Sequence, residues 1–181
     1  MQERQKEASF ALSHPLSKQF PHSLLAAPSE NQMSSQIADC VFCRIIQHQL
    51  PAEILYENDK VISILDINPI HFGHALVVPK THCLDFLSIP EDDLHDVLHA
   101  TQIVARAIVS ALKLDGFNVF SNNGRIAGQS VFHFHMHVTP RYPDDNIKFV
   151  LQLKTYKAGV LAEYGTRIRE HVHLQLNGKE N

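Results

Sequence analysis

The chain has 181 residues, 44% of them hydrophobic, which is enough to bury one sizeable core. Its formal net charge of −3, with histidine neutral, offers no electrostatic case for binding nucleic acid or an anionic membrane surface. The sequence contains no apolar run near the roughly 18–20 residues that a bilayer span requires. We therefore expect one globular domain whose partners include neither nucleic acid nor membrane.

The two ends of the chain differ in composition from the middle. Residues 1–39 are rich in Gln, Ser, Pro and Glu and lack a sustained hydrophobic period, which predicts a flexible N-terminal extension. The main domain is expected over 40–145. Residues 146–181 are expected to form a C-terminal helical tail, because a weak helical period runs through about 150–173.

The first part of the domain predicts a short helix and three strands. The helix covers 41–47, and strands follow at 53–56, 60–65 and 75–78, rich in β-branched residues and separated by turn-forming residues. Each connection is too short for a parallel crossover. We therefore predict an antiparallel meander.

The clearest helix of the chain follows the meander. Apolar residues recur at three- and four-residue spacing from Leu94 to Leu112. Ser88 is the expected N-cap, with Pro90 and acidic residues in the first turn, and Gly116 suits the C-terminal turn. Two more strands, at 117–121 and 130–139, would complete a five-stranded sheet.

Two of the three cysteines form a CxxC pair, Cys40-Val-Phe-Cys43. Such a pair is half of a zinc site, a redox pair or a coincidence. The redox hypothesis requires a βαβ context that the flanking sequence does not have, and a zinc site requires two further ligands, which histidine would have to supply. With no secretory signal recognisable, three cysteines predict a reducing, cytoplasmic compartment.

The stretch GQSVFHFHMHVTPR, residues 128–141, places His133, His135 and His137 at every second position between large apolar residues. On a strand, the three imidazoles would share one face. They suit a metal held by all three, a pH-sensing cluster, or attack of a neutral imidazole on phosphorus. The third hypothesis uses most of the segment, because Gln129 and Ser130 would donate hydrogen bonds to phosphoryl oxygens.

The run from His133 to Thr139 resembles the signature of the histidine triad (HIT) family, His-φ-His-φ-His-φ-φ. INPIHFGHALVVPKTH, from Ile67 to His82, is similar to a second stretch of that family, and the resemblance covers about residues 40–145. It implies an α+β, HIT-like fold. That fold has a five-stranded antiparallel sheet, one long helix, a short N-terminal helix and a C-terminal helical tail, and two such units usually form a homodimer with a continuous sheet.

The resemblance also implies an activity. His135 would attack the α-phosphorus of a purine nucleoside phosphoramidate or a dinucleoside polyphosphate, and a nucleotidyl-histidine intermediate would then release a nucleoside monophosphate. The alternative is a nucleotide-binding or zinc-stabilised interaction protein with little turnover.

Family positions map onto further residues of this chain. Four residues match family positions that contact the phosphate or the leaving group: His137, Gln129, Ser130 and Asn122. Asp66 matches the family's carboxylate that binds the ribose. A base pocket would be lined by Phe42, Ile45, Ile64 and Ile67, each of which serves equally well as a core residue. In a subset of the family, CxxC is completed by two histidines, which implies structural zinc at Cys40, Cys43, His82 and His133. The remaining histidines, His74 among them, we interpret as surface or packing residues.

Overall fold

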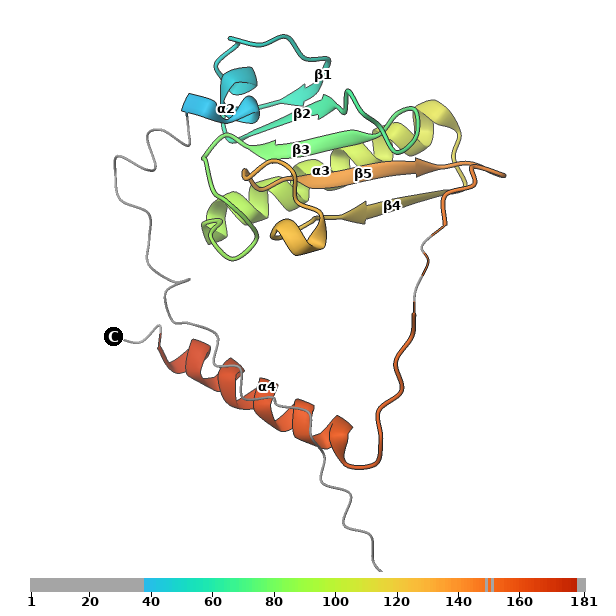
Figure 1. Ribbon diagram of the computed structural model, residues 1–181. Helices are drawn as coiled ribbons and strands as arrows, with labels where there is room; N and C mark the ends of the chain where they lie inside the picture. Colours follow the sequence, from blue (N-terminus) through green and yellow to red (C-terminus); the bar gives the residue numbers. More distant parts are fainter. Residues whose placement is uncertain (1–37, 149, 151, 179–181) are drawn as a thin grey trace, which may run out of the picture. The chain divides into compact units, whose positions relative to one another are not determined.

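The computed structural model describes residues 38–148, 150 and 152–178 (Figure 1). Nearly all of the predicted extension 1–39 therefore lies outside the described residues. The chain divides into two compact units between Pro143 and Asp144. The domain limits predicted from the sequence stay a prediction, because compactness does not test which part folds by itself.

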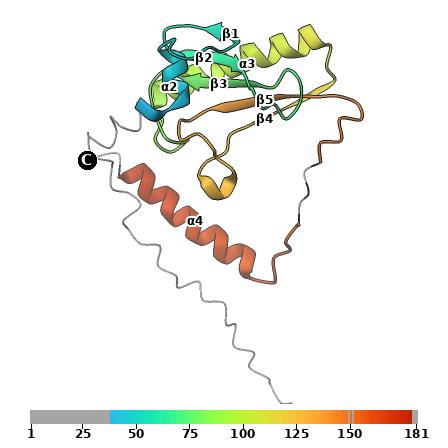
Figure 2. The ribbon, with the colours of Figure 1, turned by 45° about the horizontal axis from the view of Figure 1, so that its top comes forward.

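The first unit is an antiparallel five-stranded sheet with helices on its faces (Figures 1 and 2). The strand order is β1-β2-β3-β5-β4. The strands are β1 Ile54–Glu57, β2 Val61–Leu65, β3 Ala75–Pro79, β4 Gly116–Phe120 and β5 Met136–Arg141. The helices are α2 Val41–Ile46, α3 Glu91–Leu112 and the 3₁₀ turn η2 Arg125–Ala127. The predicted α+β fold is confirmed.

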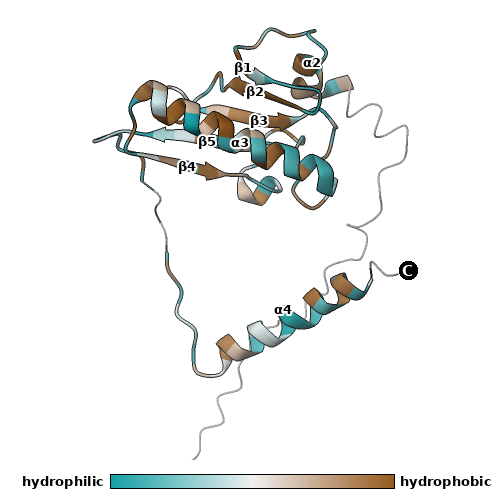
Figure 3. Cartoon of the chain, turned by 180° about the vertical axis from the view of Figure 1, so that it is seen from behind, coloured by the Kyte–Doolittle hydropathy of each residue, from teal (hydrophilic) through white to brown (hydrophobic). Residues whose placement is uncertain are grey.

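Alternating side chains of the central strands form two cores, one on each face of the sheet. On the face seen from behind in Figure 3, Val77 and Val138 pack beneath α3, whose Val97 and Val104 are buried against them. On the other face, four strand residues meet the short helix α2: Ile62, Ile64, Leu76 and Val78. His137 of β5 lies on this second face, because it is the pairing partner of Leu76.

The ends of α3 differ from the sequence prediction. Pro90, not Ser88, occupies the N-cap position, and Ser88 instead bonds Asp85 within the preceding turn. At the other end Lys113 adopts the left-handed conformation, with φ 54°, that the prediction assigned to glycine. Gly116 is then free to begin β4. The local turn 85–88 competes for the Ser88 hydroxyl, which explains the missing cap.

Strand β5 begins six residues later than predicted, at Met136 instead of 130. Its ladder with β3 joins Ala75–Val77 to Met136–Val138 and ends there. Upstream, the backbone N–H of Phe134 bonds the carbonyl of Cys83, so the chain follows the loop after β3 and leaves the ladder. His133 and His135 therefore lie in an extended segment before the strand.

Among its described residues, the second unit contains one helix, α4 Val160–Asn177, which starts ten residues after the start of the predicted helical period. Its apolar residues, Leu161, Tyr164, Ile168 and Val172, are exposed within that unit. No helix among the described residues is long and apolar enough to cross a membrane.

Candidate active site and metal centre

The three histidines form a row of rings along the α2 face of the sheet. The rings of His135 and His137 meet edge to face with centroids 4.8 Å apart. Phe42 of α2 contacts both His133, at 5.9 Å, and His135, at 5.1 Å. The predicted alternation is thus correct for the side chains, although only the last of the three residues belongs to the strand.

His135 is held in the tautomer that a nucleophile requires. Its Nδ1 lies 2.7 Å from the carbonyl oxygen of His133. A carbonyl only accepts hydrogen bonds, so Nδ1 carries the proton and Nε2 keeps its lone pair. Among the described residues, Nε2 of His135 has no hydrogen-bond partner, and it is not one of the buried polar atoms that lack a partner. This nitrogen therefore reaches solvent.

Burial keeps His135 neutral. Desolvation lowers its pKa below the ordinary value, opposed by the hydrogen bond to His133 and by the charge of Asp66. The neutral imidazole is the nucleophilic form. His135 therefore combines an accessible lone pair with a protonation state suited to attack near neutral pH.

His137 is fixed from two sides. Phe120 of β4 stacks on its ring at 4.6 Å with an interplanar angle of 12°. Its Nδ1 lies 2.9 Å from Nε2 of His74. Burial, then the proximity of His135 and His74, lowers the pKa of His137 to about 4, so this ring is also neutral near pH 7.

His74 is a residue whose contacts the sequence interpretation missed. It is 1% exposed and lies one residue before β3, with Nδ1 3.3 Å from Asp66 Oδ2. The alternation of side chains along a strand could have indicated this contact. His74 lies two residues before Leu76 and so shares its face of the sheet, and Leu76 pairs with His137. A buried imidazole needs polar partners, and these two residues provide them.

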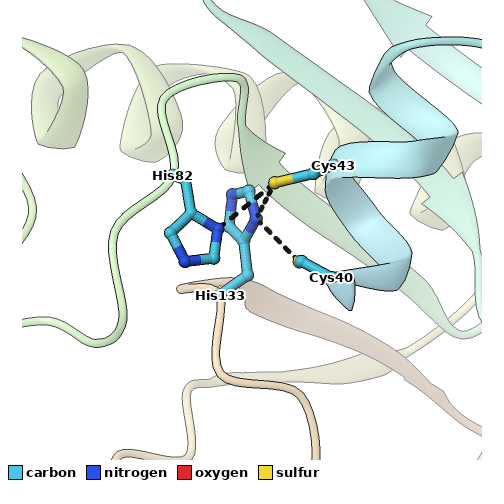
Figure 4. Close-up of side chains that lie close together, drawn as sticks. All are labelled: Cys40, Cys43, His82 and His133. Atoms are coloured by element: carbon cyan, nitrogen blue, oxygen red, sulfur yellow. Dashed lines mark hydrogen bonds between the residues drawn. The ribbon is translucent and has the colours of Figure 1, made fainter. Parts of the chain in front are cut away.

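Four side chains from distant parts of the chain form a second group beside the row, which we call the metal cluster (Figure 4): Cys40, Cys43, His82 and His133. His133 Nδ1 lies 3.4 Å from Cys40 Sγ and 3.5 Å from Cys43 Sγ, and His82 Nδ1 lies 3.2 Å from Cys43 Sγ. A tetrahedral zinc site has sulfur–nitrogen edges of about 3.6 Å. The four residues could therefore hold a metal ion with little movement.

The protonation chemistry of the cluster also suits a metal. Nε2 of His133 donates to the carbonyl of Pro79 at 2.9 Å, which directs the Nδ1 lone pair toward the sulfurs. Burial lowers the pKa of His133 to about 4, so the ring is a neutral ligand. Burial and the neighbouring Cys40 raise the pKa of Cys43 to about 12, so a bound cation would have to displace its proton.

The predicted phosphate contacts lie on the loop before the histidines. Ser130 is exposed and lines a pocket of about 540 Å³ together with Arg125. Gln129 is buried, and its amide bonds backbone groups of three residues, Leu84, Gly124 and Val131. In this conformation Gln129 holds the loop together. Its role toward a phosphate, and that of Asn122 beside Gly128, stay predictions.

The predicted base-pocket residues divide into two groups. Phe42, Ile45 and Ile64 are buried in the core between α2 and the sheet, which is the packing role that the sequence left open. Ile67, by contrast, is 89% exposed. Asp66 lies beside it, with Oδ1 accepting a bond from the Asn68 backbone. Ile67 and the partly exposed Asp66 can meet a ligand at the surface, whereas the other three residues are buried in the core.

The chain belongs to the HIT domain family, whose model matches residues 47–144. A relative from Candida albicans named adenosine 5′-monophosphoramidase is 42% identical over 112 residues, covering 58% of this chain and 71% of that protein. An adenylylsulfatase of Arabidopsis thaliana is 41% identical over 107 residues, covering 59% of this chain and 54% of that protein. Some members of the family thus carry the names of nucleotide hydrolases.

Solved structures show the same fold. A HIT family protein of Bacillus subtilis is 36% identical, with a TM-score of 0.69 over 73% of this chain and 96% of that chain. A zinc-bound histidine triad family protein of Mycobacterium smegmatis is 35% identical, with a TM-score of 0.59 over 80% of this chain and 99% of that chain. Together with the metal cluster, the second structure makes zinc the metal to test first.

Proposed function

We propose that the protein is a nucleotidyl hydrolase or transferase that acts at the α-phosphorus of a purine nucleoside phosphoramidate or dinucleoside polyphosphate through His135. The observation that carries the proposal is the hydrogen bond from His135 Nδ1 to the His133 carbonyl, which leaves Nε2 accessible and unprotonated. The two named relatives support an adenosine 5′-phosphoryl group as the transferred part.

The proposed reaction has two steps. The Nε2 lone pair of His135 forms a bond to the α-phosphorus while the bond from phosphorus to the leaving group breaks, and the leaving group departs with its electron pair and is protonated. Water then attacks phosphorus, the bond to Nε2 breaks, and the nucleoside monophosphate leaves. While Nε2 is bonded to phosphorus the ring is cationic, and the Nδ1–H bond to His133 stabilises that charge.

Groups around the row would assist this chemistry. Ser130 and the backbone after Gly128 would donate to the phosphoryl oxygens, and His137 would contact the leaving group. Asp66 would accept hydrogen bonds from the ribose hydroxyls, with Ile67 at the exposed base side. Asn122 and Gln129 would hold the phosphate loop.

The test is a pre-steady-state assay with an adenosine 5′-phosphoramidate of a fluorescent amine. We expect a burst of about one amine per chain, with adenylate trapped on the protein after acid quench. His135→Ala should lose the burst and reduce turnover by roughly 10³-fold or more, while still binding the probe. The matched control is His95→Ala, an exposed histidine of α3 that should leave the burst intact.

One outcome would favour the alternative function. If the unaltered protein binds the probe but shows neither burst nor turnover, it is a nucleotide-binding or zinc-stabilised interaction protein, and the proposal of catalysis is wrong. If turnover occurs without trapped adenylate, the covalent intermediate is wrong although the hydrolase assignment stands.

We also propose that the metal cluster binds one structural zinc ion per chain. Four protein ligands close the coordination sphere and leave no position for water, so this ion would tie α2 and the loop after β3 to the histidine segment without activating a nucleophile. The three cysteines are free, which supports a reducing compartment and the proposed cytoplasmic location.

Finally, we propose a homodimer formed through α3 and β4. Among the described residues β4 is an edge strand, and its Phe117 and Val119 are 44% and 42% exposed. They line a groove of about 530 Å³ with Leu98 and Ala105 of α3. A second copy would cover this apolar surface and extend the sheet.

Light scattering after gel filtration tests the dimer. We expect twice the 20.5 kDa chain mass, and Val119→Lys should halve it because a cation would be buried at the interface. Leu87→Lys, at a loop position that is 91% exposed, is the control. A monomeric mass for the unaltered protein would rule the dimer out.

A further inference from the structure

A pocket of about 540 Å³ lies beside the histidine segment, and we call it the loop pocket. Its walls come from four parts of the chain: the start of α2, the loop after β3 at Leu84, the 3₁₀ turn η2 at Arg125, and residues 130–132. Small-molecule sites in proteins have volumes of about 300–1,000 Å³. The loop pocket is therefore large enough for a small ligand, of which the function proposed above uses only the phosphate contact at Ser130.

The hydrogen bonds of one buried side chain hold the walls of the loop pocket together. Gln129 is 5% exposed, and its Nε2 donates to the carbonyl oxygens of Leu84, at 2.7 Å, and Val131, at 3.1 Å. Its Oε1 accepts from the N–H of Gly124, at 2.7 Å, one residue before η2. A single amide thus joins the loop after β3, the start of η2 and the segment that leads to the histidines, so the pocket is preformed.

Arg125 supplies the positive charge of the loop pocket. Among the described residues that line the pocket it is the only cation. Its guanidinium carbon lies 4.7 Å from the centroid of the Phe132 ring, a contact that orients the group without neutralising it. In the described part of the chain no carboxylate forms an ion pair with Arg125, including that of Asp39, the exposed acid of the same pocket. The N–H donors of Arg125 are therefore available to an anion, and a guanidinium fits phosphate oxygens well.

The loop pocket borders the proposed site of chemistry. Ser130, the proposed donor to the phosphoryl oxygens, lines the pocket together with Arg125. Cys40, at another wall, lies 3.4 Å from the ring of His133, the residue whose carbonyl orients His135. A ligand whose α-phosphate is bound by Ser130 can therefore continue into the pocket toward Arg125.

The two substrate classes of the proposed function place different charges next to the α-phosphorus. A phosphoramidate loses an amine, which carries no negative charge after protonation and gains nothing from a nearby cation. A dinucleoside polyphosphate loses a nucleotide: the bond from the α-phosphorus to the bridging oxygen breaks, and that oxygen leaves with the electron pair as part of the β-phosphate. A guanidinium beside the β-phosphate stabilises the charge that develops there.

We propose that the loop pocket is the subsite for an anionic leaving group, a phosphate chain, and that Arg125 is the residue that selects it. The proposal rests on the function proposed above and narrows its substrate to a dinucleoside polyphosphate. His137 would contact the bridging atom, and Arg125 would bind the phosphate beyond it. Phe132 orients the guanidinium, and Gln129 holds the walls of the pocket.

The first test measures binding and needs no turnover. AMP ends at the α-phosphate, whereas α,β-methylene ADP adds a β-phosphate through a carbon bridge that is not hydrolysed. By isothermal titration calorimetry we expect the unaltered protein to bind the methylene analogue about tenfold more tightly than AMP. Arg125→Gln should remove that preference and change the AMP affinity by less than about twofold, and Arg125→Lys should retain part of the preference. Arg167→Gln, at an exposed arginine of α4, is the matched control.

The second test compares two leaving groups on the same adenosine 5′-phosphoryl group, diadenosine triphosphate against the phosphoramidate of an alkylamine. We expect Arg125→Gln to lower kcat/KM by about 100-fold for diadenosine triphosphate and by less than about threefold for the phosphoramidate. Phe132→Leu, which removes the aromatic contact but keeps the cation, should act in the same direction by about threefold. Zinc content and melting temperature, measured in parallel, report whether each variant is folded.

The results separate the inference from the proposed function. Equal affinity of the unaltered protein for AMP and its methylene analogue, or an unchanged preference in a folded Arg125→Gln, would overturn the inference. An equal loss of kcat/KM for both substrates would do the same, because it indicates a merely structural role of Arg125. A preference that depends on Arg125 in a protein without turnover would leave the anion subsite intact and reject the hydrolase.

Discussion

Two groups of side chains flank His135: the metal cluster, and the group formed by Asp66, His74 and His137, which we call the histidine array. In the metal cluster, one sulfur or nitrogen atom from each of four residues lies within 4.8 Å of the others, and three sulfur–nitrogen distances are 3.2–3.5 Å. In the histidine array, the partners of His74 lie at opposite ends of its ring. The two groups differ in the directions in which their nitrogen, oxygen and sulfur atoms point. Those directions, and not the residue types, decide whether a group can bind a cation or forms a series of hydrogen bonds.

The two groups should therefore affect different properties of the protein. The metal cluster joins α2, the loop after β3 and the histidine segment, so it should control stability. The histidine array ends at a ring that touches the nucleophile, so it should control chemistry. His133 connects the two, because its ring belongs to the cluster while its carbonyl orients His135.

The largest expected effect comes from breaking the metal cluster. Cys43→Ser should abolish most of the zinc content and lower the melting temperature by at least about 10 °C, since the metal's binding energy is folding energy. Turnover measured at low temperature should fall less, by about threefold, because the ion activates no water. Calorimetry and metal analysis check this. Cys83→Ser, a buried cysteine outside the cluster, is the control, and equal zinc content in Cys43→Ser would disprove the site.

The pH dependence of kcat/KM sharpens the chemical side of the comparison. His135 must be neutral to attack, and burial lowers its pKa, so activity should persist below the ordinary imidazole value and disappear only at lower pH. An unshifted group of pKa about 6.5 would be roughly one quarter neutral at pH 6.0. Because the pKa of His135 is lowered, we expect a larger fraction of the plateau activity than that at pH 6.0. An acid midpoint at or above 6.5 would contradict the assignment.

The smallest effects come from the two phenylalanines. Phe42 contacts His133 and His135, whereas Phe120 stacks on His137 alone. Phe42→Leu should lower the melting temperature by about 4 °C and kcat by a few fold. Phe120→Leu should reduce kcat by a similar factor and leave zinc content unchanged. Zinc loss in Phe120→Leu would show that the two groups are not separable.

Much of the fold and of the candidate site could be predicted from local pattern. The alternation around His133, His135 and His137 predicts a shared face, and the apolar spacing from Leu94 to Leu112 predicts α3. Resemblance to a family added the pairing of Cys40 and Cys43 with two distant histidines. Errors occurred at element ends, where the turn at Ser88 and the Phe134–Cys83 bond compete with regular structure.

By itself the sequence determined the five strands and the long helix, because periodicity is a local property, and the resemblance to the HIT family added His135 as the candidate nucleophile. Only the tertiary structure decided which ring nitrogen of His133 and of His135 carries the proton and that His74 contacts His137. The protonated nitrogens depend on single backbone groups, the Pro79 carbonyl and the His133 carbonyl, whose positions follow from strand pairing and loop course. A proton's position on an imidazole is set by what lies at hydrogen-bond distance, and three-dimensional packing alone determines that.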